Sequence, residues 1–120
     1  MKIAITAQGV DLNSELDSRF GRAKQFIIVD SETKEFEIIN NEQNLNAAQG
    51  AGIQSGQNII NSGAEALITG HCGPKAYKVL NAGDIKIYYA KDGTVNELLD
   101  KLKSNELQLA DSADVEGHWV

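Results

Sequence analysis

One stretch of the chain predicts a strand, a sharp turn and a helix in direct succession: Ala66-Leu67-Ile68-Thr69-Gly70-His71-Cys72-Gly73-Pro74. Residues 66–69 are mostly apolar and end at a glycine, which is typical of a short strand. Pro74 has a fixed φ and no backbone N–H, so it suits the first position of a helix. We therefore expect a strand over 66–69 and a helix that opens on Pro74, with Gly73 at its cap.

The turn in this stretch is the first place to look for chemistry, because it holds the chain's one cysteine beside one of its two histidines. The start of the helix leaves backbone N–H groups with partial positive charge, which favour an anion or a thiolate. Cys72 is therefore a candidate reactive thiol. The alternative, which we favour for the thiol itself, is that Cys72 is a small buried apolar residue in a tight turn.

The composition limits the classes of function that the chain can have. With 120 residues, 42% of them hydrophobic, we expect one domain over 1–108 and a flexible tail over 109–120. The net charge of −6 argues against a nucleic-acid partner. A single cysteine excludes an internal disulfide and a four-cysteine metal cluster. Neither a membrane-helix run nor a signal-peptide core is present, so we expect a cytoplasmic protein with no membrane partner.

The remaining patterns predict an alternation of strands and helices. Helices are expected before Gly63, with Ile53, Gly56 and Ile60 on one face, and again after Gly73 and after Gly93. The last of these begins with a capping-box pattern, Thr94 with Glu97 three residues later. Strands are expected over 2–7, 25–30, 35–39, 66–69 and 84–90.

This order of elements predicts an α/β fold. We expect a three-layer α/β/α sandwich around a five-stranded mixed sheet, in the strand order 3-2-1-4-5 with the second strand antiparallel. That arrangement matches the ribonuclease-H-like architecture. Nuclease chemistry would need metal-binding carboxylates on the central strands, and residues 2–7 and 66–69 carry none. We therefore reject a nuclease function.

A second candidate site lies in the run Arg19-Phe20-Gly21-Arg22-Ala23, which places two cations in an otherwise acidic chain. Guanidinium groups match the geometry of carboxylates and phosphates, so the two arginines could hold an anionic ligand. They could equally pair with Asp11, Glu15 or Asp17 in the preceding polar loop, and the residues alone favour this local pairing. The polar loop itself either borders a site or is simply solvated.

Four motifs, which follow one another in a fixed order along the chain, make the sequence similar to a known family. They are Arg19-Phe20-Gly21-Arg22-Ala23, Gly50-Ala51-Gly52-Ile53-Gln54, Thr69-Gly70-His71-Cys72-Gly73-Pro74-Lys75-Ala76 and Gly93-Thr94-Val95. With them the chain resembles the dinitrogenase iron–molybdenum cofactor biosynthesis family from Met1 to about Leu107. The resemblance implies a ribonuclease-H-like layer sandwich. It also implies a protein that binds an iron–sulfur-based metallocluster, iron–molybdenum cofactor or a precursor, and hands it on without catalytic turnover.

The resemblance also implies a site. Many members of the family have a histidine where this chain has Arg19, and arginine cannot coordinate a metal, so Arg19 would contact an anionic cluster by charge. The implied metal ligands are Cys72 and His71, a soft thiolate and an imidazole. The other implied cofactor-binding residues are Arg19, Phe20, Gly21, Arg22, Gly50, Gly52, Gly70 and Gly73. Gly50 and Gly52 resemble a nucleotide-binding loop only superficially, because no buried strand precedes them.

Two further classes of function stay open on the sequence. One is a regulatory module that binds a small anion or a protein through the arginine loop, without metal. The other is an enzyme with Cys72 as nucleophile and His71 as base, which we do not expect because adjacent residues of an extended segment point to opposite faces. As partners we expect cofactor-assembly or acceptor proteins, and we expect a monomer or a weak homo-oligomer. A C-terminal histidine and tryptophan, His118-Trp119, could fold back over a site.

Overall fold

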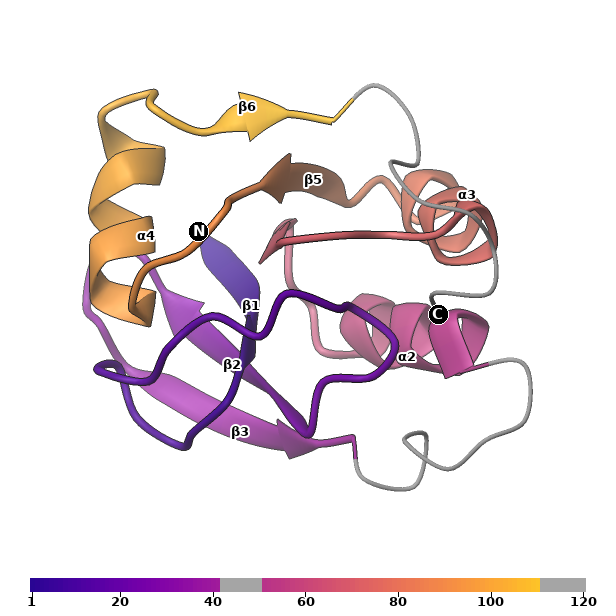
Figure 1. Cartoon of the computed structure of the whole chain (residues 1–120), viewed down its shortest axis with the longest axis horizontal. Helices are drawn as coiled ribbons and strands as arrows, with labels where there is room; N and C mark the ends of the chain where they lie inside the picture. The colour runs from indigo at the N-terminus through magenta and orange to yellow at the C-terminus, as the bar shows by residue number, and fades with distance from the viewer. Residues whose placement is uncertain (42–50, 111–120) are drawn as a thin grey trace.

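The computed structural model describes residues 1–41 and 51–110 (Figure 1). Strands and helices alternate after an initial run of three strands. The elements in chain order are β1 (Lys2–Ala7), β2 (Gln25–Asp30), β3 (Phe36–Asn40), α2 (Ala51–Asn61), β4 (Ala66–Thr69), α3 (Pro74–Ala82), β5 (Lys86–Tyr89), α4 (Val95–Lys103) and β6 (Gln108–Leu109).

The strands form one mixed sheet of six, in the order β3-β2-β1-β4-β5-β6. β2 lies antiparallel to β1, whereas β4 lies parallel to β1 and β5 parallel to β4. The predicted order 3-2-1-4-5 with an antiparallel second strand is therefore confirmed. Central β1 and β4 are buried on both faces because helices cover both sides of the sheet, as parallel strands require.

The predicted number of strands was wrong, because the sheet has a sixth strand. β6 pairs antiparallel with Tyr88–Tyr89 of β5, and both of its residues are exposed. Two exposed residues cannot produce the alternation of buried and exposed positions by which a strand is recognised in a sequence. β6 also spans the boundary that we expected between a domain ending at 108 and a tail. Residues 111–120, including His118 and Trp119, lie outside the described residues.

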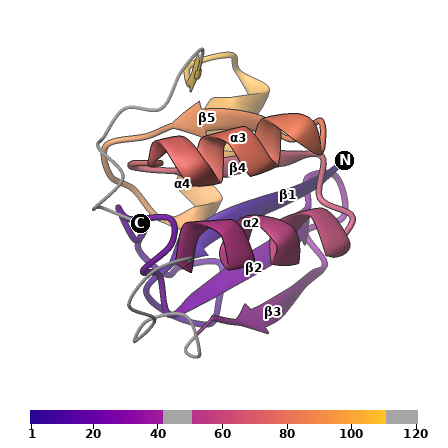
Figure 2. The ribbon, with the colours of Figure 1, turned by 90° about the vertical axis from the view of Figure 1, so that its right-hand side faces the viewer.

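Two layers of helix enclose the sheet. Figure 2 shows α2 and α3 side by side on one face, with α4 on the other. Alternate residues of the strands feed two separate cores, as the period of two requires. On the first face Ala4, Phe26 and Leu67 pack with Ile59 of α2 and Leu80 of α3. On the second face the partners are Ile3, Ile5, Ile27 and Ile68 from the strands and Val95, Leu98 and Leu99 from α4.

The helix ends follow the sequence signals. Gly73 is the N-cap of α3 with Pro74 at its first position, and Gly63 follows α2 with a φ of +82°, in the left-handed region that favours glycine. α4 begins with the full capping box of Thr94 and Glu97. No helix within residues 1–41 and 51–110 has the length and apolar character needed to cross a membrane.

The buried face of α2 differs from the predicted one. Of the three predicted positions, Gly56 is buried and Ile60 half-buried, but Ile53 is 44% exposed, and Ser55 and Ile59 are buried in its place. A Cβ added to Gly56 would lie 3.0 Å from Cγ1 of Val79 in α3, so the two helices approach each other closely at this glycine. The buried face is therefore rotated from the predicted one toward Ser55 and Ile59, so that α2 meets α3 at Gly56.

Candidate functional site

The candidate site lies where the path of the chain changes direction within the sheet. β1 and β4 are parallel neighbours, but the chain leaves β1 toward β2 and leaves β4 toward β5. In open α/β sheets such a point leaves a crevice outside the carboxyl ends of the strands, where ligands bind. Two segments meet here: the loop of residues 8–24 after β1, and the turn of residues 70–73 after β4.

A pair of buried threonines fixes the first loop to the sheet. The Thr6 hydroxyl donates to the backbone oxygen of Asp17 at 2.6 Å, and the Asp17 N–H donates to the backbone oxygen of Thr6 at 2.9 Å. The hydroxyl oxygens of Thr6 and Thr69 lie 3.1 Å apart, and both side chains are fully buried. Sequence reasoning missed this pair, although the two threonines stand at the carboxyl ends of strands predicted to be neighbours.

The loop and the turn are also joined directly through their backbones. Residues Arg19 and His71 form a parallel bridge, and the Phe20 N–H donates to the backbone oxygen of His71 at 3.2 Å. At Gly70 an added Cβ would lie 2.6 Å from the backbone oxygen of Ser18, so only glycine fits this approach. The structure therefore brings together the two segments that the sequence singled out.

The first loop borders a depression of about 460 Å³ in which positive charges gather. Arg19 and Arg22, both named as candidate binding residues, line it together with a third cation, Lys24. Its other lining residues, Gln8, Asp17 and Ser18, are polar. Gln8, Asp17 and Ser18 belong to the polar loop for which the sequence left open a place beside a site, whereas Lys24 was not assigned to one, because it joins the others only when the loop folds back on the end of β1.

None of the other predicted residues that the structure describes lines the depression. Phe20 and Gly21 are buried, and the ring of Phe20 stacks on that of Phe26 with centroids 5.4 Å apart. They support the loop from beneath. Gly70 and Gly73 are buried in the turn after β4, and Gly52 is buried in α2. Gly50 lies outside the described residues.

The charges of the depression are only partly balanced within the described parts of the chain. There, no ion pair within 4.0 Å joins Arg19 or Lys24 to a carboxylate, so the local pairing that the sequence favoured is not formed by Arg19. The one carboxylate in the lining is that of Asp17, and its Oδ1 accepts a hydrogen bond from the backbone N–H of Arg19 at 3.2 Å. Burial raises the pKa of the Asp17 carboxyl, an effect that outweighs this hydrogen bond and the charges of Arg19 and Lys24.

The two predicted metal ligands have very different surroundings. Cys72 is fully buried in the core beside Phe20 and Ala76, and its Sγ lies 3.6 Å from the backbone oxygen of Gly73. His71, by contrast, is half-buried. Across the described residues, no group of three His, Cys, Asp or Glu side chains is placed to hold a metal ion. Within these residues, His71 and Cys72 alone do not make up a complete set of protein ligands for a metal cluster.

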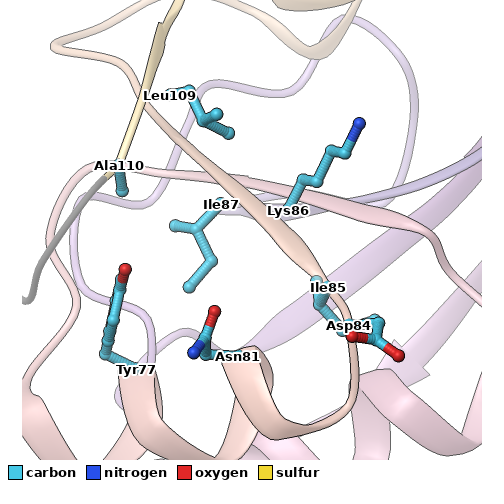
Figure 3. A pocket seen from close by; sticks show the side chains of 8 residues that line it. All are labelled: Tyr77, Asn81, Asp84, Ile85, Lys86, Ile87, Leu109 and Ala110. Atoms are coloured by element: carbon cyan, nitrogen blue, oxygen red, sulfur yellow. The ribbon is translucent and has the colours of Figure 1, made fainter.

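A second depression, of about 300 Å³, lies between α3, β5 and β6 (Figure 3). Its floor is apolar, with Ile87, Leu109 and Ala110 on the side of the strands, and Tyr77 and Asn81 of α3 border it. None of the residues that the sequence singled out lines it. The first depression, which Arg19 and Arg22 line, is therefore the candidate site.

Comparison with known protein families identifies the family of the chain from its sequence. A family model described as dinitrogenase iron-molybdenum cofactor matches residues 1–105. An uncharacterized protein of Methanocaldococcus jannaschii is 34% identical over 111 residues, with 90% of each chain covered.

Solved structures of two similar proteins cover almost the whole chain. The apo form of the orange protein from Desulfovibrio gigas superposes with a TM-score of 0.92 at 35% identity, covering 95% of this chain and 96% of that one. A Thermotoga protein provisionally named as a NifB protein superposes with a TM-score of 0.83 at 34% identity, covering 97% of this chain and 98% of that one. The chain therefore belongs to the dinitrogenase iron–molybdenum cofactor family.

Proposed function

We propose that this protein binds an anionic, iron–sulfur-based metallocluster and hands it to an acceptor protein without catalytic turnover. The cluster is of the iron–molybdenum cofactor type or a precursor of it. The family and its association with this cofactor support the class of cargo. We also propose that the fold is ribonuclease-H-like and that the protein is cytoplasmic.

One observation carries the proposal: three cations line one depression in a chain whose net charge is −6. In an acidic protein, Arg19, Arg22 and Lys24 would be expected to pair with nearby carboxylates. Arg19 and Lys24 have no such partner within 4.0 Å among residues 1–41 and 51–110. A concave patch of one sign attracts ligands of the opposite sign and raises their local concentration. The site is thus suited to an anion of two or more charges.

His71 and Cys72 have unequal parts in this proposal. His71 lies on the turn whose backbone is bonded to the arginine loop and is half-buried, so we propose its imidazole as the one protein ligand that the cargo can reach without a change in the core. Cys72 would have to leave the core before its sulfur could bind, since it is fully buried. The cargo is therefore held mainly by charge, and an ionic hold of this kind releases its ligand readily to an acceptor.

The test is anaerobic binding of a preassembled cubane iron–sulfur cluster that carries small exchangeable thiolates. After desalting, visible absorption and bound iron per chain are measured for the wild type, Arg19→Gln and Lys24→Gln. Lys78→Gln is the matched control, because Lys78 is an exposed cation of α3 outside the depression. We expect the wild type and the control to retain the cluster and both depression variants to retain several-fold less. A colourless wild type, or equal retention by all variants, would refute the proposal.

A second candidate is a module that binds a small anion or an acidic partner without any metal. It is favoured by the burial of Cys72 and by the lack of a three-donor group in the described parts of the chain. Inorganic phosphate separates the two candidates. If phosphate raises the melting temperature of the wild type but not of Arg22→Ala, and the cluster is not retained, the metal-free module is correct.

A further inference from the structure

Asp17 is an unusual member of the depression, because it places a carboxylate among three cations. Its backbone is held at both ends, with the N–H donating to Thr6 and the C=O accepting from the Thr6 hydroxyl. The carboxylate lines the depression together with Arg19 and Lys24 and accepts a hydrogen bond from the Arg19 N–H at 3.2 Å. The sheet therefore fixes the position of this negative charge, and an entering anion must approach it.

Among the described residues, no cation lies within 4.0 Å of the Asp17 carboxylate to form an ion pair with it. Asp17 nevertheless lies close enough for the charges of Arg19 and Lys24 to lower its pKa, while burial raises the pKa by more. A bound anion would add a like charge beside the carboxylate and displace water from it. Both changes favour the neutral carboxylic acid over the carboxylate.

We infer that Asp17 is the internal counter-anion of the depression and that a multivalent anionic cargo binds there together with one proton, which adds to the Asp17 carboxylate. The inference rests on the proposed function and names a further residue of the same site. The proton comes from solvent and forms an O–H bond on the carboxyl group; no other bond changes. On release of the cargo the carboxyl loses the proton and again neutralises part of the positive charge.

The sign of the resulting pH dependence follows from linkage. Burial raises the pKa of the carboxyl in the free protein, and the like charge of a bound anion raises it further, so in the complex the carboxyl holds its proton to a higher pH. Affinity for the anion therefore rises as pH falls, by at most tenfold for each pH unit. The charged and titratable groups around Asp17 are Arg19, Arg22 and Lys24 on its own loop, and His71 on the turn after β4. The end of β1 contributes only uncharged Gln8 to the lining.

Sulfate is the appropriate probe, because it is divalent and does not titrate between pH 5 and 8. Its affinity for the full chain is measured across this range by calorimetry in two buffers of different ionisation enthalpy, which counts the protons taken up. The variants are Asp17→Asn, which keeps the size of the side chain, and Glu15→Gln as the matched control. Glu15 is exposed, lies in the same loop and does not line the depression. His71→Gln removes the other titratable group.

We expect the wild type, Glu15→Gln and His71→Gln to bind sulfate more tightly as pH falls, with uptake of up to one proton. Asp17→Asn should bind about threefold to tenfold more tightly than the wild type at pH 7.5 and take up no proton. A pH-independent wild type, or a slope that survives in Asp17→Asn, would overturn the inference. If cluster binding is retained in either case, the proposed function stands. A wild type that binds neither sulfate nor the cluster would overturn both.

Discussion

The two segments that meet at the carboxyl end of the sheet are joined by their backbones but present their side chains differently. The loop around Arg19 displays cations to a depression, whereas the turn around Cys72 directs its sulfur into the core. The two lie in register, with Arg19 beside His71. In this structure the site therefore presents cationic side chains to a ligand, whereas the thiol of Cys72, the soft metal ligand, is buried.

The largest effect should come from closing the space between the two segments. In Gly70→Ala the new Cβ would lie 2.6 Å from the backbone oxygen of Ser18, which cannot move without shifting the loop. We expect a loss of about 3 kcal/mol in the free energy of unfolding, measured by urea denaturation. Gly63→Ala is the comparison: it has a φ of +82° but open space, and should cost only about 1 kcal/mol. Equal costs would show that the segments are not in tight contact.

Truncation of the buried thiol should have a smaller effect on stability. Cys72→Ala leaves a small void in the core beside Phe20 and Ala76 and should cost about 1–2 kcal/mol. In the wild type, a thiol reagent should react with Cys72 about a hundredfold more slowly in buffer than in denaturant, because reaction requires local opening. Rapid stoichiometric labelling of folded protein at neutral pH would show that the thiol is as accessible as the arginine loop, and would support Cys72 as a nucleophile.

The buried threonine pair should make a comparable or slightly smaller contribution. Thr6→Val removes the donor to the Asp17 carbonyl and leaves that oxygen and the Thr69 hydroxyl short of a partner, at a cost of about 1–2 kcal/mol. Thr69→Val should cost less, since the bond to Asp17 survives. The double variant should be more stable than the sum of the single effects predicts, because the two hydroxyls share one interaction. Strictly additive costs would show that the hydroxyls do not interact.

The smallest effects should come from two carboxylates with opposite shifts. Hydrogen bonds from Thr94 lower the pKa of Glu97, so its contribution to stability is present at neutral pH and is lost as pH falls. Burial raises the pKa of Asp17, so its charged form costs stability as pH rises. In denaturation between pH 7 and pH 3, Glu97→Gln should be less stable than the wild type at pH 7, and Asp17→Asn more stable. Both differences should shrink at pH 3; shifts of the same sign would contradict this assignment.

Much of the fold could be predicted from local patterns. The strand order followed from alternating apolar runs and the handedness of crossovers, and the helix ends followed from Pro74, Gly63 and the Thr94 capping box. β6 could not be predicted, because its two exposed residues acquire their structure only by pairing with β5. Ile53 was misplaced because α2 buries the polar Ser55 beside Gly56, and a buried polar residue does not contribute to an apolar period.

The candidate site was predictable in part. The sequence indicated the arginine loop and the glycine-rich turn, and it favoured for Cys72 the buried position that the thiol has in the core. The membership of the depression was not predictable, because it depends on the loop folding back on β1. That return is made by long-range backbone bonds, such as the Gln8 N–H to the Glu15 oxygen at 2.9 Å. Backbone bonds leave no signature in residue identity, so Lys24 could not be assigned to the site, and the place of Asp17 in it stayed open.

The central claim, that the cargo is held by charge rather than by the thiol, is tested most directly by comparing two variants for binding of the same preassembled cluster. One is the double variant Arg19→Gln/Lys24→Gln, and the other is Cys72→Ala. Bound iron per chain is measured anaerobically at equal protein and cluster concentrations. The account predicts that the double variant loses most of the cluster while Cys72→Ala retains it at close to the wild-type level. Loss of the cluster in Cys72→Ala with full retention in the double variant would contradict it.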